Sequence, residues 1–178
     1  MRGCHHSPHL PCRGSPDFQS GYFFSILLVL ILHARTYTAN MDTNNPVVKL
    51  CADGIKAEME GKPEEARRLF LQAWEQSKDD YDACIAAHYV ARHQKRPEEI
   101  LRWNQESLDR ANAINDQRVQ GFYPSLYLNM GKAHEDLAHR EEARKYYELA
   151  AERSDVLPDG KYGDMVRDGV KRGLQRVR

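Results

Sequence analysis

The chain has little of three features that mark common protein classes: cysteine, net charge and long apolar runs. It holds four cysteines among 178 residues, two of them within the first forty, which argues against a disulfide scaffold. Its formal net charge at pH 7 is zero. A protein that binds nucleic acid through its overall charge carries a marked excess of positive charge, so the sequence argues against this class of protein. Binding through a local basic patch stays open.

The first forty residues differ in composition from the rest. They contain three of the 26 basic groups, one of the 26 acidic groups and four of the eight histidines, which leaves residues 41–178 with 23 basic and 25 acidic groups. Residues 22–32 (YFFSILLVLIL) are almost wholly apolar. Eleven residues are too few for a membrane span of ~20, but they suit a signal-peptide core of ~7–15.

The flanks of this apolar run fit a signal peptide poorly, because a proline-rich stretch precedes it and no clear cleavage site follows. We therefore favour an interpretation in which Met41 is the true start and residues 1–40 are a misassigned leader. A genuine signal or anchor segment is the alternative. The leader also clusters residue types that bind metals, but nothing around them predicts a fixed geometry, and we expect no metal there. These residues are Cys4, His5, His6, His9 and Cys12.

From Met41 onward, the chain repeats one short phrase. KPEEA at residues 62–66 returns as RPEEI at 96–100 and as HREEA at 139–143. Pro63 and Pro97 are 34 residues apart, and the third phrase follows after the same step plus nine. Proline suits the first helical position, and the two glutamates favour the positive end of the helix dipole. The phrase therefore predicts the start of a helix in each of three repeated helical hairpins.

At this register, the chain resembles the tetratricopeptide repeat family, which keeps small and large residues at set positions. The repeats span about 47–80, 81–115 and 124–157, and the first and third match the family pattern while the second departs from it except in spacing. The five positions hold Leu50, Gly54, Ala66, Phe70 and Ala73 in the first repeat, Cys84, His88, Ile100, Asn104 and Ser107 in the second, and Tyr127, Gly131, Ala143, Tyr147 and Ala150 in the third.

The resemblance implies an all-α fold, a right-handed solenoid of about three antiparallel helix hairpins. Small residues such as Gly54 and Gly131 would let paired helices cross closely, while Phe70 and Tyr147 fill the wedge between hairpins. We expect Gly61 to end a helix, and the nine extra residues after the second repeat to form a turn or to lengthen a helix. A last helix over about 162–177 would cap the stack, with Val170 and Leu174 buried.

No catalytic motif is recognisable, so we expect a non-enzymatic protein without cofactor or metal. Cys84 and His88 are four residues apart, but two ligands alone do not predict a metal site. The resemblance implies a protein-interaction module that holds a peptide or helix in its concave groove, lined by the first helix of each hairpin. The predicted groove residues are Ile55, Ile85, Tyr89, Arg92, His93, Leu128, Asn129 and Lys132.

An alternative function is a regulatory or RNA- or ribosome-associated protein that uses the basic C-terminal helix. Its cations are Arg167, Lys171, Arg172, Arg176 and Arg178. We expect a protein or peptide partner, nucleic acid only through that helix, and membrane only if residues 22–32 form an anchor. The expected compartment is the cytoplasm, with a secreted or membrane-anchored protein as the alternative if the apolar segment is genuine.

Overall fold

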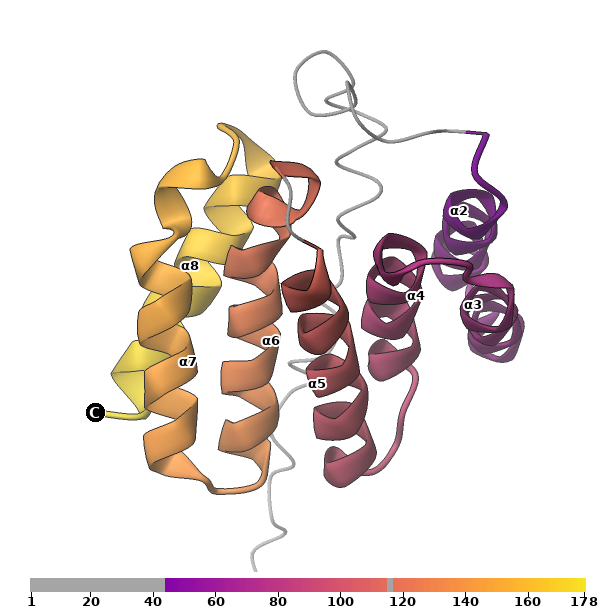
Figure 1. Ribbon diagram of the computed structural model, residues 1–178. Helices are drawn as coiled ribbons and strands as arrows, with labels where there is room; N and C mark the ends of the chain where they lie inside the picture. Colours follow the sequence, from indigo (N-terminus) through magenta and orange to yellow (C-terminus); the bar gives the residue numbers. More distant parts are fainter. Residues whose placement is uncertain (1–43, 115–116) are drawn as a thin grey trace, which may run out of the picture.

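The computed structural model describes residues 44–114 and 117–178, which form seven α-helices and no strand (Figure 1). This confirms the predicted all-α class. The predictions for residues 1–40 lie outside the described residues. The elements are α2 (Pro46–Met59), α3 (Pro63–Gln76), α4 (Asp80–Arg92), α5 (Pro97–Ala113), the 3-10 helix η2 (Gln117–Phe122), α6 (Tyr123–Asp136), α7 (Arg140–Glu152), the 3-10 turn η3 (Ser154–Val156) and α8 (Lys161–Arg176).

The repeated phrase begins helices, as the sequence predicts. Pro63 and Pro97 are the first residues of α3 and α5, and two glutamates occupy the first turn of each helix. The third phrase lacks the proline, yet α7 also begins within it, at Arg140, with Glu141 and Glu142 in its first turn. Acidic side chains there offset the positive end of the helix dipole.

Two of the tight turns between helices have the same backbone conformation. Gly61 follows α2 with a φ of 72°, and Ala138 follows α6 with a φ of 59°. In each turn, an amide bonds a carbonyl five residues earlier: Lys62 N to Ala57 O and His139 N to His134 O, both at 2.9 Å. Glycine adopts this left-handed conformation without strain, whereas alanine does so at a cost. The predicted role of Gly61 is confirmed.

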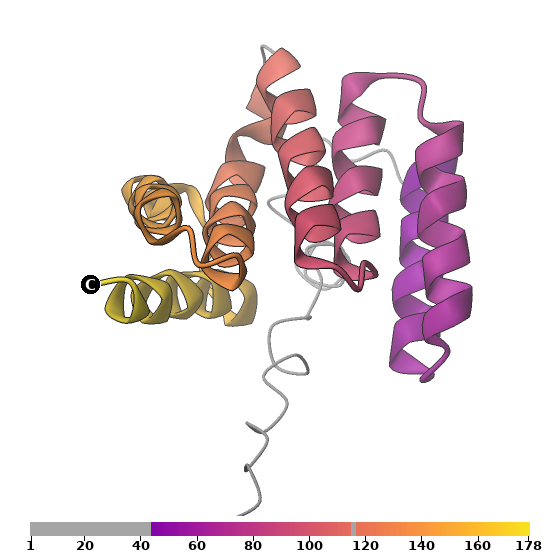
Figure 2. The same ribbon diagram turned by 90° about the horizontal axis from the view of Figure 1, so that it is seen from below.

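Helices joined by short turns pack as the pairs α2/α3, α4/α5 and α6/α7, which stand side by side in chain order (Figures 1 and 2). The last helix, α8, packs against α7 and α6, as α4 packs against α3 and α2. Val166 and Val170 of α8 are buried, and Leu174 is half-buried against the third pair. This helix therefore covers the end of the row, as expected for a cap.

In the first and third pairs, an aromatic ring lies directly on a glycine of the partner helix. A Cβ built on Gly54 would come within 2.3 Å of the Phe70 ring, and one on Gly131 within 2.6 Å of the Tyr147 ring. Both rings are fully buried. Each also reaches the next element: Phe70 stacks on Tyr89 of α4, and Tyr147 lies against Gly173 of α8. Each ring thus fills the space between the two helices of its pair and also packs against the helix that follows the pair.

The described residues after the second repeat form the 3-10 helix η2, and α5 has 17 residues where its counterpart α3 has 14. Helix α5 ends at Ala113, and η2 leads into α6. Val119 and Phe122 of η2 are buried, and the Phe122 ring lies 5.9 Å from that of Tyr81. The segment therefore contributes to the core between the second and third pairs. Within the described part of the chain, no helix is both long enough and apolar enough to cross a bilayer.

Candidate functional site

The eight residues predicted to line a groove fall into three groups, and the first of these is part of the core. Ile55 and Ile85 are each 6% exposed, and Tyr89 is 2% exposed. Tyr89 stacks on Phe70, with ring centroids 5.0 Å apart and planes at 14°. The apolar wall expected from these three residues is therefore packed against other side chains of the protein. Helical spacing identified their common face but not what covers it.

The second group, Arg92 and His93, binds a carboxylate of the first pair. Arg92 Nη2 donates to Glu58 Oε2 and His93 Nε2 meets Glu58 Oε1, both at 2.8 Å. The three side chains are only 10–20% exposed. The Arg92 guanidinium also lies 5.4 Å from the centre of the Tyr89 ring. These two side chains hold the end of α4 to the end of α2.

The third group, Leu128, Asn129 and Lys132 on α6, is half-buried, and the Lys132 side chain is 41% exposed. Leu128 packs towards the cap, and Lys132 pairs with Asp136 of the same helix. The side-chain amide of Asn129 donates to His88 Nδ1 at 3.3 Å, which requires that the ring proton of His88 sits on Nε2.

The second pair buries polar side chains where the other pairs bury glycine and an aromatic ring. His88 occupies the position of Gly54 and Gly131, and Asn104 that of Phe70 and Tyr147; they are 9% and 6% exposed. Burial, reinforced by the charge of Arg92, lowers the pKa of His88 to about 3. This histidine is therefore neutral at physiological pH and serves as a hydrogen-bond acceptor for α6.

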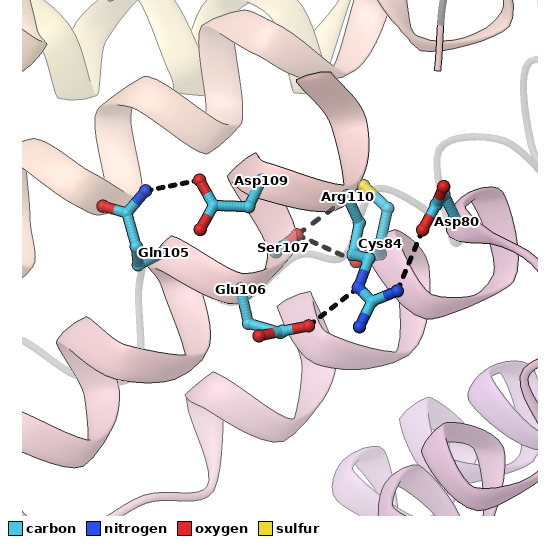
Figure 3. Close-up of polar contacts among 7 residues, drawn as sticks. All are labelled: Asp80, Cys84, Gln105, Glu106, Ser107, Asp109 and Arg110. Atoms are coloured by element: carbon cyan, nitrogen blue, oxygen red, sulfur yellow. Dashed lines mark hydrogen bonds and ion pairs between the residues drawn. The ribbon is translucent and has the colours of Figure 1, made fainter. Parts of the chain in front are cut away.

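Helices α4 and α5 are also joined by polar contacts (Figure 3). The Ser107 hydroxyl donates to the Cys84 carbonyl at 2.8 Å and lies 3.7 Å from the Cys84 sulfur. Burial raises the pKa of Cys84 to about 11 and also raises that of Cys51. Both cysteines are free, buried thiols, so neither presents the thiolate that nucleophilic or metal chemistry requires.

Nearer the surface, Arg110 connects the same two helices. It donates to Asp80 at 2.9 Å and to Glu106 at 2.7 Å, while Gln105 donates to Asp109 at 2.8 Å (Figure 3). The guanidinium lies 5.8 Å from the Trp74 ring, which meets Trp103 edge to face at 5.0 Å. The contact between the two tryptophan rings joins α3 to α5.

Glu135 on α6 holds the capping helix in place. It occupies the same repeat position as Glu58, and it accepts hydrogen bonds from Arg176 at 2.6 and 2.9 Å and from the Tyr147 hydroxyl at 2.6 Å. Burial alone would raise the pKa of this carboxyl, but the bonds from Arg176 and Tyr147 outweigh burial and lower it. Sequence analysis did not identify this cluster, although the repeat register aligns Glu58 with Glu135.

A second feature that sequence analysis missed is the pair of histidines His134 and His139 at the turn between α6 and α7. Their Nδ1 atoms are 3.3 Å apart, and their ring centres are 5.6 Å apart. The His134 ring also stacks on the Tyr146 ring, with centroids 5.3 Å apart and planes at 9°. Each histidine alone has no catalytic partner in the sequence, and the contact between His134 and His139 depends on the left-handed turn at Ala138.

Comparisons of the chain with models of protein families, with curated proteins and with solved structures find no match. In the described ranges 44–114 and 117–178, no cluster of three or more histidine, cysteine, aspartate or glutamate side chains is arranged to hold a metal ion.

Proposed function

We propose that this chain is a non-enzymatic protein-interaction module of the tetratricopeptide type, acting in the cytoplasm. The observation that carries the proposal is the ring-on-glycine contact, which recurs at the same repeat positions in the first and third pairs. A repeated contact of this kind stacks helical pairs into a short solenoid, and such solenoids present extended binding surfaces. The capping position of α8 agrees with this architecture.

The proposed ligand is an extended or helical peptide with apolar anchors and an acidic group. Leu128, Asn129 and Lys132 of α6 offer an apolar side chain, an amide and a cation on one helix. Lys132 pairs with Asp136 of its own helix, and its side chain is 41% exposed. An acidic ligand side chain would exchange one exposed ion pair for another, at little energetic cost.

A phage-displayed peptide library panned against the full chain tests this function. We expect enrichment of peptides with an acidic residue near an apolar one. Lys132→Glu should weaken binding of the enriched peptides at least tenfold, because it reverses the charge that faces the acidic group. Lys145→Glu, an exposed position on α7, is the matched control and should leave binding unchanged. No enrichment, or equal binding by both variants, would refute the proposal.

The structure gives less support to the alternative, nucleic-acid binding through the basic last helix. Three of its arginines are engaged within the protein: Arg167 with Asp164 at 2.9 Å, Arg172 with Asp168 at 4.0 Å, and Arg176 with Glu135. Each pairing reduces the charge available to phosphates. Binding of an RNA probe that weakens steeply as salt is raised would favour this alternative.

A further inference from the structure

Aspartate followed directly by glycine occurs three times in the chain, at Asp53, Asp159 and Asp168. In this dipeptide, the glycine nitrogen can attack the aspartate side-chain carboxyl group and close a five-membered ring, because glycine has no side chain that hinders the approach. All three aspartates are exposed to solvent. The conformation of the backbone therefore decides at which of them the ring forms.

Two of the three dipeptides lie inside helices. Asp53 and Gly54 belong to α2, Asp168 and Gly169 belong to α8, and both glycines are buried. In the interior of an α-helix, each amide donates a hydrogen bond to the carbonyl four residues earlier. The glycine nitrogen is then engaged, so ring closure requires that the helix first opens locally.

The third dipeptide lies in the turn between η3 and α8. Asp159 is outside both elements, and Gly160, the residue before α8, has a φ of 108°. The Gly160 carbonyl accepts a hydrogen bond from the Asp164 amide at 3.0 Å, whereas the Gly160 amide donates none within the described residues. The nitrogen that must attack is therefore not held by a hydrogen bond of the fold.

Both sides of this turn are anchored to the capping helix. Leu157 is buried in one cluster with Tyr162 of α8. The Pro158 carbonyl oxygen lies over the first turn of α8, where it would be 2.0 Å from a Cβ built on Gly163, and it accepts a hydrogen bond from Arg167 at 3.4 Å. A longer backbone between these anchors would therefore displace the start of α8.

We propose that Asp159 and Gly160 form a site of spontaneous isoaspartate formation, and that this modification loosens the capping helix. The Gly160 nitrogen bonds to the side-chain carboxyl carbon of Asp159, and the carboxyl hydroxyl leaves as water with the amide proton. Water then opens the resulting imide ring. Opening at the backbone carbonyl leaves the chain running through the side chain, which adds one methylene to the backbone and frees the α-carboxylate. Overall, no atom is gained or lost.

The test is to age the full chain at 37 °C and pH 7.4 and to locate isoaspartate by mass spectrometry of its peptides. Electron-transfer fragmentation distinguishes isoaspartate from aspartate of equal mass. We expect the modification at Asp159 to form at least tenfold faster than at Asp53 or Asp168. The control is the same chain unfolded in guanidinium chloride, in which the three sites should react at similar rates.

Asp159→Glu keeps the charge and prevents the reaction, because its ring would have six members and closes far more slowly. The aged parent should melt at a lower temperature than the fresh parent, whereas ageing should leave the melting temperature of Asp159→Glu unchanged. Asp168→Glu, on α8, is the matched control and should lose stability on ageing as the parent does.

Three results would overturn the proposal. They are equal rates at the three sites of the folded chain, no isoaspartate at Asp159 in the time in which the unfolded chain forms it, and an unchanged melting temperature of an aged parent that carries the modification.

Discussion

The first and third helical pairs are packed alike, and the second, at the same positions, is packed differently. A glycine and a ring sixteen residues later meet in α2/α3 and in α6/α7. In α4/α5 these positions hold His88 and Asn104, both buried. His88 accepts a hydrogen bond from Asn129 of the next pair, while Phe70 stacks on Tyr89 and Tyr147 covers Gly173.

The difference shows that the three pairs share the spacing of their core positions, whereas the residue types at these positions differ in the second pair. A ring on glycine joins a pair to its neighbour by apolar contact, which does not depend on pH. A buried neutral histidine joins two pairs by a hydrogen bond that protonation disrupts, because protonated Nδ1 no longer accepts. The second pair therefore makes the stability of the whole row sensitive to acid.

Removing a ring from an outer pair should have the largest effect. Phe70→Ala and Tyr147→Ala each delete a fully buried ring, and we expect each to lower the free energy of unfolding by ~3–5 kcal/mol. Asn104→Ala, at the equivalent position, should cost less, ~1–3 kcal/mol, because it removes a smaller polar group. Urea unfolding at pH 7 measures all three. Equal losses at the three positions would contradict the proposed difference between the pairs.

Acid should reduce stability through His88. Its folded pKa of about 3 lies below the ordinary value of 6.5, so the unfolded chain takes up a proton first as the pH falls. The free energy of unfolding should thus decrease below pH 6.5 by up to ~1.4 kcal/mol per pH unit.

The variant His88→Gln isolates this contribution. It should make the free energy of unfolding depend less on pH between pH 6.5 and 5. In this range, carboxylates with lowered pKa values, such as Glu135, stay ionised. His134, whose pKa is also lowered, adds a smaller slope of the same sign because it is more exposed. Urea unfolding across this range provides the measurement, and an unchanged slope in His88→Gln would rule out the buried histidine as its source.

Alanine at Gly54 or Gly131 should have a smaller effect. The added methyl group would collide with Phe70 or Tyr147, at ~1–3 kcal/mol, while alanine regains ~1 kcal/mol of helix propensity. The expected net loss is roughly 1 kcal/mol. Gly61→Ala is the comparison: no atom lies within 4 Å of its added Cβ, so any loss there reflects backbone strain alone. Thermal unfolding distinguishes the two causes, since Phe70→Leu should rescue Gly54→Ala but not Gly61→Ala.

The sequence predicted those features that depend on local or periodic signals. Pro63 and Pro97 predicted where two helices start, and Gly61 predicted where one ends. The small and aromatic residues at set positions predicted the close packing of the helices in the first and third pairs. It did not predict that Tyr89 is buried, because helical spacing gives a face but not its neighbours. The contact between His134 and His139 also escaped prediction, since a left-handed alanine is not a usual turn signal.

A double-mutant cycle at His88 and Asn104 tests most directly the claim that the three pairs share one register with different chemistry. His88→Gly alone should leave a cavity, and Asn104→Phe alone should collide with His88, so each single variant should be less stable than the parent. Together they recreate the ring-on-glycine contact, and urea unfolding should show a favourable coupling of ~1–3 kcal/mol together with a weaker dependence on acid pH. Strictly additive losses would show that the second pair does not share the register of the other two.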